Sequence, residues 1–174
     1  MTEDMSSHIP KDQHLRRIRI WLAIFIAGLV LSGLTAFPLA AELRWLVALL
    51  HTGWMEPVAQ STGLLAWVER VNKALVTTDA RYPFLAYGTD WLAFAHLAIA
   101  IAFIGPYLDP VRNKWVVTFG LIACAGVIPL ALIAGQVRGI PLAWRFIDCS
   151  FGVIGSAPLL ISRRLIAAME RENP

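Results

Sequence analysis

Four long apolar stretches constrain this chain more than any other feature. Each has close to the 20 residues that a helix needs to cross a bilayer core about 30 Å thick, at about 1.5 Å per residue. Only the last of them contains charged residues, Arg145 and Asp148. The sequence therefore predicts an all-α fold, a four-helix transmembrane bundle forming one membrane domain over residues 20–162, with spans at about 20–41, 91–108, 115–137 and 142–162.

The composition excludes several other classes of protein. The chain has 174 residues, of which 57% are hydrophobic and only 16% are charged, whereas a soluble domain carries about 25% charged residues. An ordinary soluble domain and a disordered chain are therefore excluded, and two cysteines are too few for a disulfide-rich secreted scaffold. The formal net charge is only +3, without a long basic run, so no nucleic-acid partner is expected.

The first stretch also resembles a signal peptide, because Arg16, Arg17 and Arg19 precede it. However, the apolar part of a signal peptide has about 7–15 residues, and the run over residues 20–41 is longer. Its end lacks a good match to a small-residue cleavage site. We therefore expect a retained membrane anchor.

The distribution of Lys and Arg predicts the orientation of the bundle. Residues 1–19, 109–114 and 163–174 hold nine of them, whereas the longer segment 42–90 holds four. We expect both termini, and with them the tails 1–19 and 163–174, to be cytoplasmic in a bacterial inner membrane. Four tryptophans agree with this orientation, because they lie at the expected ends of spans, where the membrane meets water: Trp21, Trp91, Trp115 and Trp144.

Residues 42–90 are expected to form a periplasmic cap. Apolar residues recur at helical spacing in 42–55 and again in 63–76, which predicts two short amphipathic helices that lie at the membrane interface. A turn-rich stretch is expected over 77–83. The cap either lies flat on the membrane or packs as a lid over the bundle.

Six polar residues lie in or next to the predicted spans, where ionisable groups are costly and need partners: Asp90, His96, Gln136, Arg138, Arg145 and Asp148. All fall in the periplasmic half, so we expect them to converge in a ligand-binding pocket beneath the cap. Arg145 and Asp148 are spaced to pair on one helix face. A hydrogen bond between His96 and Asp148 is also expected.

This polar set leaves three interpretations open. Arg138 and Arg145 suit an anionic lipid headgroup. His96 and Asp148 suit proton transfer or acid–base chemistry on a lipid-borne substrate, and they are the candidate catalytic residues. The third interpretation is a structural ion-pair network that fixes the register of the helices.

No cofactor and no metal site is expected. A membrane haem usually needs two axial histidines, and only His96 lies within a span, so haem would require either an inward-folded His51 or a second copy of the chain. Cys124 and Cys149 are interpreted as core residues, since the chain has no C-x-x-C motif.

The sequence thus predicts a small integral inner-membrane protein that binds a lipid or small ligand in a periplasmic polar pocket, or serves as a subunit of a membrane complex. The alternative is a membrane enzyme or a redox or proton-transfer subunit that uses His96 and Asp148. Expected partners are the lipid bilayer, a lipid or small anionic ligand, and a second copy or another membrane protein. Nucleotide-binding, zinc-protease and serine-hydrolase motifs are absent.

Overall fold

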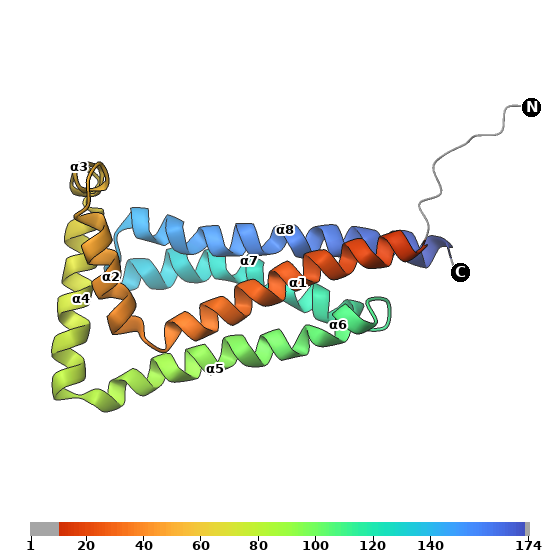
Figure 1. Cartoon of the computed structure of the whole chain (residues 1–174), viewed down its shortest axis with the longest axis horizontal. Coiled ribbons are helices and arrows are strands. Elements are labelled where there is room, and N and C mark those ends of the chain that lie inside the picture. The colour runs from red at the N-terminus through yellow and green to blue at the C-terminus, as the bar shows by residue number, and fades with distance from the viewer. Residues whose placement is uncertain (1–10, 173–174) are drawn as a thin grey trace, which may run out of the picture.

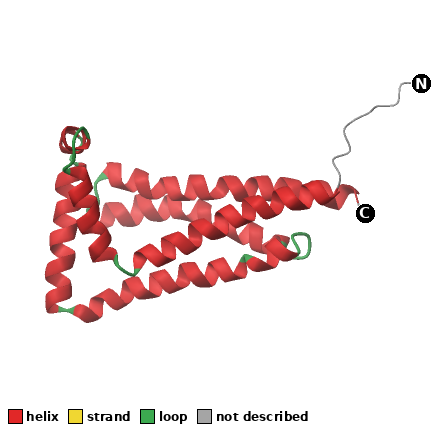
Figure 2. Ribbon diagram, viewed as in Figure 1, coloured by secondary structure: helices red, strands yellow, loops and turns green. Residues whose placement is uncertain are grey.

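The computed structural model describes residues 11–172, and all regular structure in that range is helical (Figure 2). Four helices lie alongside one another and form the bundle, and three others cross them at one end (Figure 1). The bundle helices are α1 (Lys11–Ala36), α5 (Tyr87–Ala102), α7 (Lys114–Val137) and α8 (Leu142–Glu172). The crossing helices, which we call the end cap, are α2 (Leu39–Leu50), α3 (Met55–Ser61) and α4 (Leu64–Arg81).

Within residues 11–172, four helical segments are long and apolar enough to cross a membrane, which confirms that part of the prediction. They are Asp12–Ala36, Pro83–Leu108, Lys114–Val137 and Leu142–Arg171. The second is built from a turn of 3₁₀ helix η1 (Pro83–Ala86), α5 and the short α6 (Ile104–Leu108). Helix α1 begins and α8 ends at the same end of the bundle, opposite the end cap (Figure 1).

The sequence predicted that the first apolar stretch forms one helix as far as Ala41, but the structure shows a break before that residue. Helix α1 ends at Ala36, and α2 begins at Leu39 in a new direction. Pro38 causes the break, because it has no amide hydrogen and its ring does not fit inside a continuous helix. The Pro38 carbonyl instead accepts hydrogen bonds from the amides of Ala41 and Glu42, at 2.7 and 3.0 Å, and these bonds start α2.

The end cap contains three helices where the sequence predicted two. Gly53 and Gly63, with φ of 51° and 72°, adopt the left-handed conformation that glycine tolerates best, and each lies between two of the helices. Helix α4 also extends to Arg81, so most of the stretch expected to form turns is helical. The Thr77 hydroxyl donates to the Lys73 carbonyl at 2.7 Å within this last part of α4.

The cap has a hydrophobic core of its own. Its buried members come from all three helices: Leu43, Leu50, Ala59, Leu65 and Val68. Trp144, in the first turn of α8, packs against this cluster and so joins the cap to the bundle. The bundle's separate core lies toward the other end and includes Ile18, Leu22, Phe103, Val117 and Leu159.

Helices α7 and α8 form a tight hairpin. Helix α7 stops just before Gly139, which adopts the left-handed conformation at φ 67°. The amide of the next residue, Ile140, donates to the Gly135 carbonyl at 2.9 Å, as is common where a glycine ends a helix. Farther along the hairpin, a Cβ added at Gly152 would lie 2.5 Å from the carbonyl oxygen of Cys124. The two backbones therefore approach each other as closely as glycine allows. Helix α1 packs against both α8 and α5.

Candidate functional site

Five of the six polar residues expected to converge lie near the cap end of the bundle helices, at the start of α5, the end of α7 and the start of α8, whereas His96 lies near the middle of the 16-residue α5. Gln136 and Arg138 are exposed, whereas the other four are partly buried. Helix α5 packs chiefly against α1, whereas α8 packs against α7 and α1. The structure therefore divides the set between two helix pairs instead of gathering it into one pocket.

Arg145 is the member of this set with the most developed contacts. Its Nη1 donates to the carbonyl oxygen of Leu132 on α7 at 3.3 Å. Gly135 makes room for the side chain, because a Cβ there would lie 2.5 Å from the Arg145 Cδ. The Nε atom is buried without a hydrogen-bond partner. Arg145 thus bridges the cap ends of α7 and α8 by one hydrogen bond.

The expected ion pair between Arg145 and Asp148 is not formed in the described part of the chain. The physical reason is the direction of the arginine side chain, which crosses Gly135 toward α7 instead of following its own helix. This contact could not be read from the spacing of residues in α8 alone.

His96 faces α1, not α8. Its Nδ1 donates to the Leu92 carbonyl one turn earlier, at 2.8 Å. Its Cβ lies beside Gly33 of α1, where an added Cβ would come within 3.1 Å. The expected hydrogen bond with Asp148 is not formed among residues 11–172, so no histidine–carboxylate pair is assembled at this point.

A hydrogen-bonded histidine that the sequence did not single out for this role lies in the end cap. His51 follows α2 and contacts Glu56 of α3 through Nδ1 at 3.1 Å and Glu69 of α4 through Nε2 at 3.0 Å. These two carboxylates, Glu56 first, raise the pKa of His51 above its ordinary value of 6.5. His51 therefore joins the three cap helices through its two ring nitrogens, and it does not turn inward toward His96.

A hollow of about 770 Å³ lies at the junction between α2 and the start of α8. Trp45 and Trp144, from these two helices, form part of its wall, and Glu42 is its only charged residue. The remaining lining is apolar: Pro38, Ala41, Leu43, Leu46 and Leu49. Sequence reasoning missed this site, although the two tryptophans marked its position.

Residues 11–172 contain no group of three or more His, Cys, Asp or Glu side chains placed to hold a metal ion. The comparisons with known proteins supply no analogy for any of these sites. No family model, no curated protein and no solved structure matches the chain.

Proposed function

We propose that the chain is an integral protein of a bacterial inner membrane, with four spans, cytoplasmic termini and a cap at the periplasmic interface. At most 28% of any span window is buried inside the chain, so large apolar side chains cover the outside of the bundle. Such a surface requires lipid as its solvent. The excess of Lys and Arg toward the two termini supports the orientation.

We infer that this protein binds a single amphiphilic lipid at the junction between the cap and the bundle. The observation that carries the inference is the 770 Å³ hollow, whose wall is apolar except for one carboxylate. Ligand sites usually have this character: a concave, mostly apolar surface and a few polar groups that orient the ligand. Trp45 and Trp144 suit the boundary between acyl chains and headgroups, where tryptophan is enriched.

The charge of the hollow indicates the class of headgroup. Glu42 is partly buried in the first turn of α2, and no cation pairs with it in the described chain. A carboxylate accepts hydrogen bonds, so a lipid that presents an ammonium or hydroxyl donor fits this position. This differs from the anionic ligand expected at Arg138 and Arg145, since Arg145 already donates to α7.

The test uses the full chain in nanodiscs of phosphatidylethanolamine and phosphatidylcholine, released for native mass spectrometry. We expect one retained phosphatidylethanolamine, because its ammonium donates hydrogen bonds and the quaternary ammonium of phosphatidylcholine does not. Ala41→Trp fills the hollow and should abolish retention. Ala48→Trp, on the same helix but outside that hollow, is the matched control.

Glu42→Gln should remove the preference for phosphatidylethanolamine while leaving the fold intact. If Ala41→Trp retains as much lipid as Ala48→Trp, the hollow is not the binding site. If the wild-type chain holds the two lipids equally, the role given to Glu42 is wrong.

Acid–base chemistry has less support. His96 is on α5, which packs chiefly against α1, and its Nδ1 donates to the Leu92 carbonyl instead of contacting Asp148 on α8. Membership of a larger membrane complex stays a prediction.

A further inference from the structure

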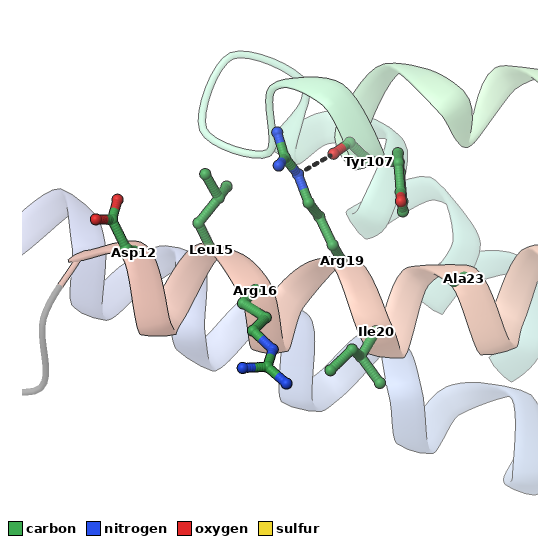
Figure 3. Close-up of a pocket in the computed structure, with 7 residues that line it drawn as sticks. All are labelled: Asp12, Leu15, Arg16, Arg19, Ile20, Ala23 and Tyr107. Carbon is green, nitrogen blue, oxygen red and sulfur yellow. Dashed lines mark hydrogen bonds between the residues drawn. The ribbon is translucent and has the colours of Figure 1, made fainter.

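A second hollow, of about 420 Å³, lies at the end of the bundle opposite the cap (Figure 3). Residues of α1 form most of its wall, and Tyr107 of α6 completes it. The lining residues are Asp12, Leu15, Arg16, Arg19, Ile20, Ala23 and Tyr107. The hollow therefore straddles the point where the charged start of α1 gives way to its apolar run.

Arg19 is held in position at this hollow. Its Nε donates to the Tyr107 carbonyl at 3.2 Å, and its Nη2 lies 3.5 Å from the Leu108 carbonyl. These are the last carbonyls of α6, where a cation is favoured by the helix dipole. The guanidinium also lies 5.9 Å from the centre of the Tyr107 ring. A guanidinium has five N–H donors, so three remain for a ligand.

Arg16 supplies a second guanidinium one turn earlier on α1. It is exposed, and neither it nor Arg19 has a carboxylate within ion-pair distance in the described chain. Asp12 also lines the hollow, but Figure 3 shows its carboxylate extending from α1 away from the Arg16 guanidinium. The positive charge of the two arginines is therefore not neutralised by the protein's own side chains.

The rest of the wall is suited to hydrocarbon. Ile20 and Ala23 lie on the bundle side of Arg19, inside the apolar run of α1, and both are exposed. A ligand that touches the whole hollow must therefore be anionic at one end and apolar at the other.

We propose that this hollow binds an anionic glycerophospholipid, with its phosphate between Arg19 and Arg16 and an acyl chain along Ile20 and Ala23. Basic pockets between membrane helices on the cytoplasmic side recognise acidic headgroups in this way. The proposal rests on the membrane placement given above, not on the lipid hollow at the cap. Arg19 is preorganised by the α6 carbonyls, whereas the exposed Arg16 guanidinium extends to the other side of α1 in Figure 3 and turns toward the phosphate when the lipid binds.

The experiment titrates the detergent-solubilised full chain with short-chain phosphatidylglycerol or phosphatidylcholine and counts bound lipid by native mass spectrometry. Arg16→Gln, which removes no hydrogen bond or ion pair among the described residues, should weaken the binding of phosphatidylglycerol about fivefold, the effect of one basic residue near an acidic headgroup. Arg16→Gln with Arg19→Gln should weaken it about 25-fold. The control, Arg112→Gln with Arg164→Gln, removes equal charge from the same end and should change binding less than twofold, because neither residue lines the hollow.

Two further arms separate a lipid from free phosphate. Ala23→Trp fills the apolar end of the hollow and should weaken the binding of phosphatidylglycerol. Ala27→Trp, one turn farther along α1 and outside the hollow, should leave that binding unchanged. Inorganic phosphate should compete poorly with the lipid. The proposal is overturned if the Arg112/Arg164 control loses as much phosphatidylglycerol binding as the Arg16/Arg19 double variant. Strong binding of phosphate alone would show that the ligand is not a lipid. Failure of the chain to insert into liposomes would instead contradict the membrane placement.

Discussion

Replacing Gly152 by alanine tests the close approach of α8 to the backbone of α7. The added Cβ would lie 2.5 Å from the Cys124 carbonyl oxygen, whereas a carbon normally approaches such an oxygen to about 3.3 Å. Helices α7 and α8 must therefore separate by about 0.8 Å, and a backbone atom cannot rotate aside as a side chain would. Overpacking of this kind costs about 1–3 kcal/mol.

Alanine also favours the helix over glycine by about 0.8–1.0 kcal/mol, which works against that cost. Gly126→Ala provides the matched control, because it lies inside α7 and its added Cβ would meet nothing within 4 Å. Both variants receive the same helix-forming advantage, so their difference isolates the steric cost. We expect Gly152→Ala to be less stable than Gly126→Ala by about 1–3 kcal/mol.

The assay is reversible unfolding of the purified chain in mixed micelles with increasing sodium dodecyl sulfate, followed by far-ultraviolet circular dichroism. The free energies of unfolding of the two variants and the wild type are compared at one detergent composition. Equal stability of the two variants, within about 0.5 kcal/mol, would refute the close approach of α7 and α8. A loss in both variants would point to a general intolerance of side chains at helical glycines.

Two further predictions concern the cap end. Gly135→Ala and Arg145→Met should each destabilise the chain by about 1.5–3 kcal/mol, through loss of the Leu132 hydrogen bond, and the double variant should fall well short of their sum in the same unfolding assay. Because the pKa of His51 is raised, its stabilisation of the cap is full below its ordinary pKa of 6.5 and is lost as pH rises through the folded value. Amide hydrogen exchange in α2–α4, corrected for its intrinsic pH dependence, should therefore show weaker protection at high pH, and His51→Gln should remove that difference; an unchanged pH response would contradict the bridge.

Much of the fold is readable from the sequence, because the requirement for long apolar helices leaves few alternatives. The four candidate spans follow from uninterrupted apolar runs. The break at Pro38 could also have been anticipated, since proline disfavours a continuous helix. The third cap helix could not, because α3 is short and its position depends on packing against α4 more than on its own periodicity.

The candidate site was harder to predict, because depth along a helix does not determine which way a side chain points. Asp148 lies toward the cap end of α8 and His96 near the middle of α5, and α5 is paired with α1 instead of α8. Arg145 likewise reaches α7 only because position 135 lacks a side chain. Pairing between helices and room at glycines are properties of the assembled bundle, and neither leaves a clear signal in one sequence.

The position of α1 between α5 and α8 has a consequence for the order of folding during synthesis. The α7–α8 hairpin closes through a short turn, so it pays little loop-closure entropy once both helices exist. Helix α1 is synthesised before α8, but part of its packing surface lies against α8. We therefore expect the span formed by α1 to stay incompletely packed in the bilayer until α8 has been synthesised and packs against it.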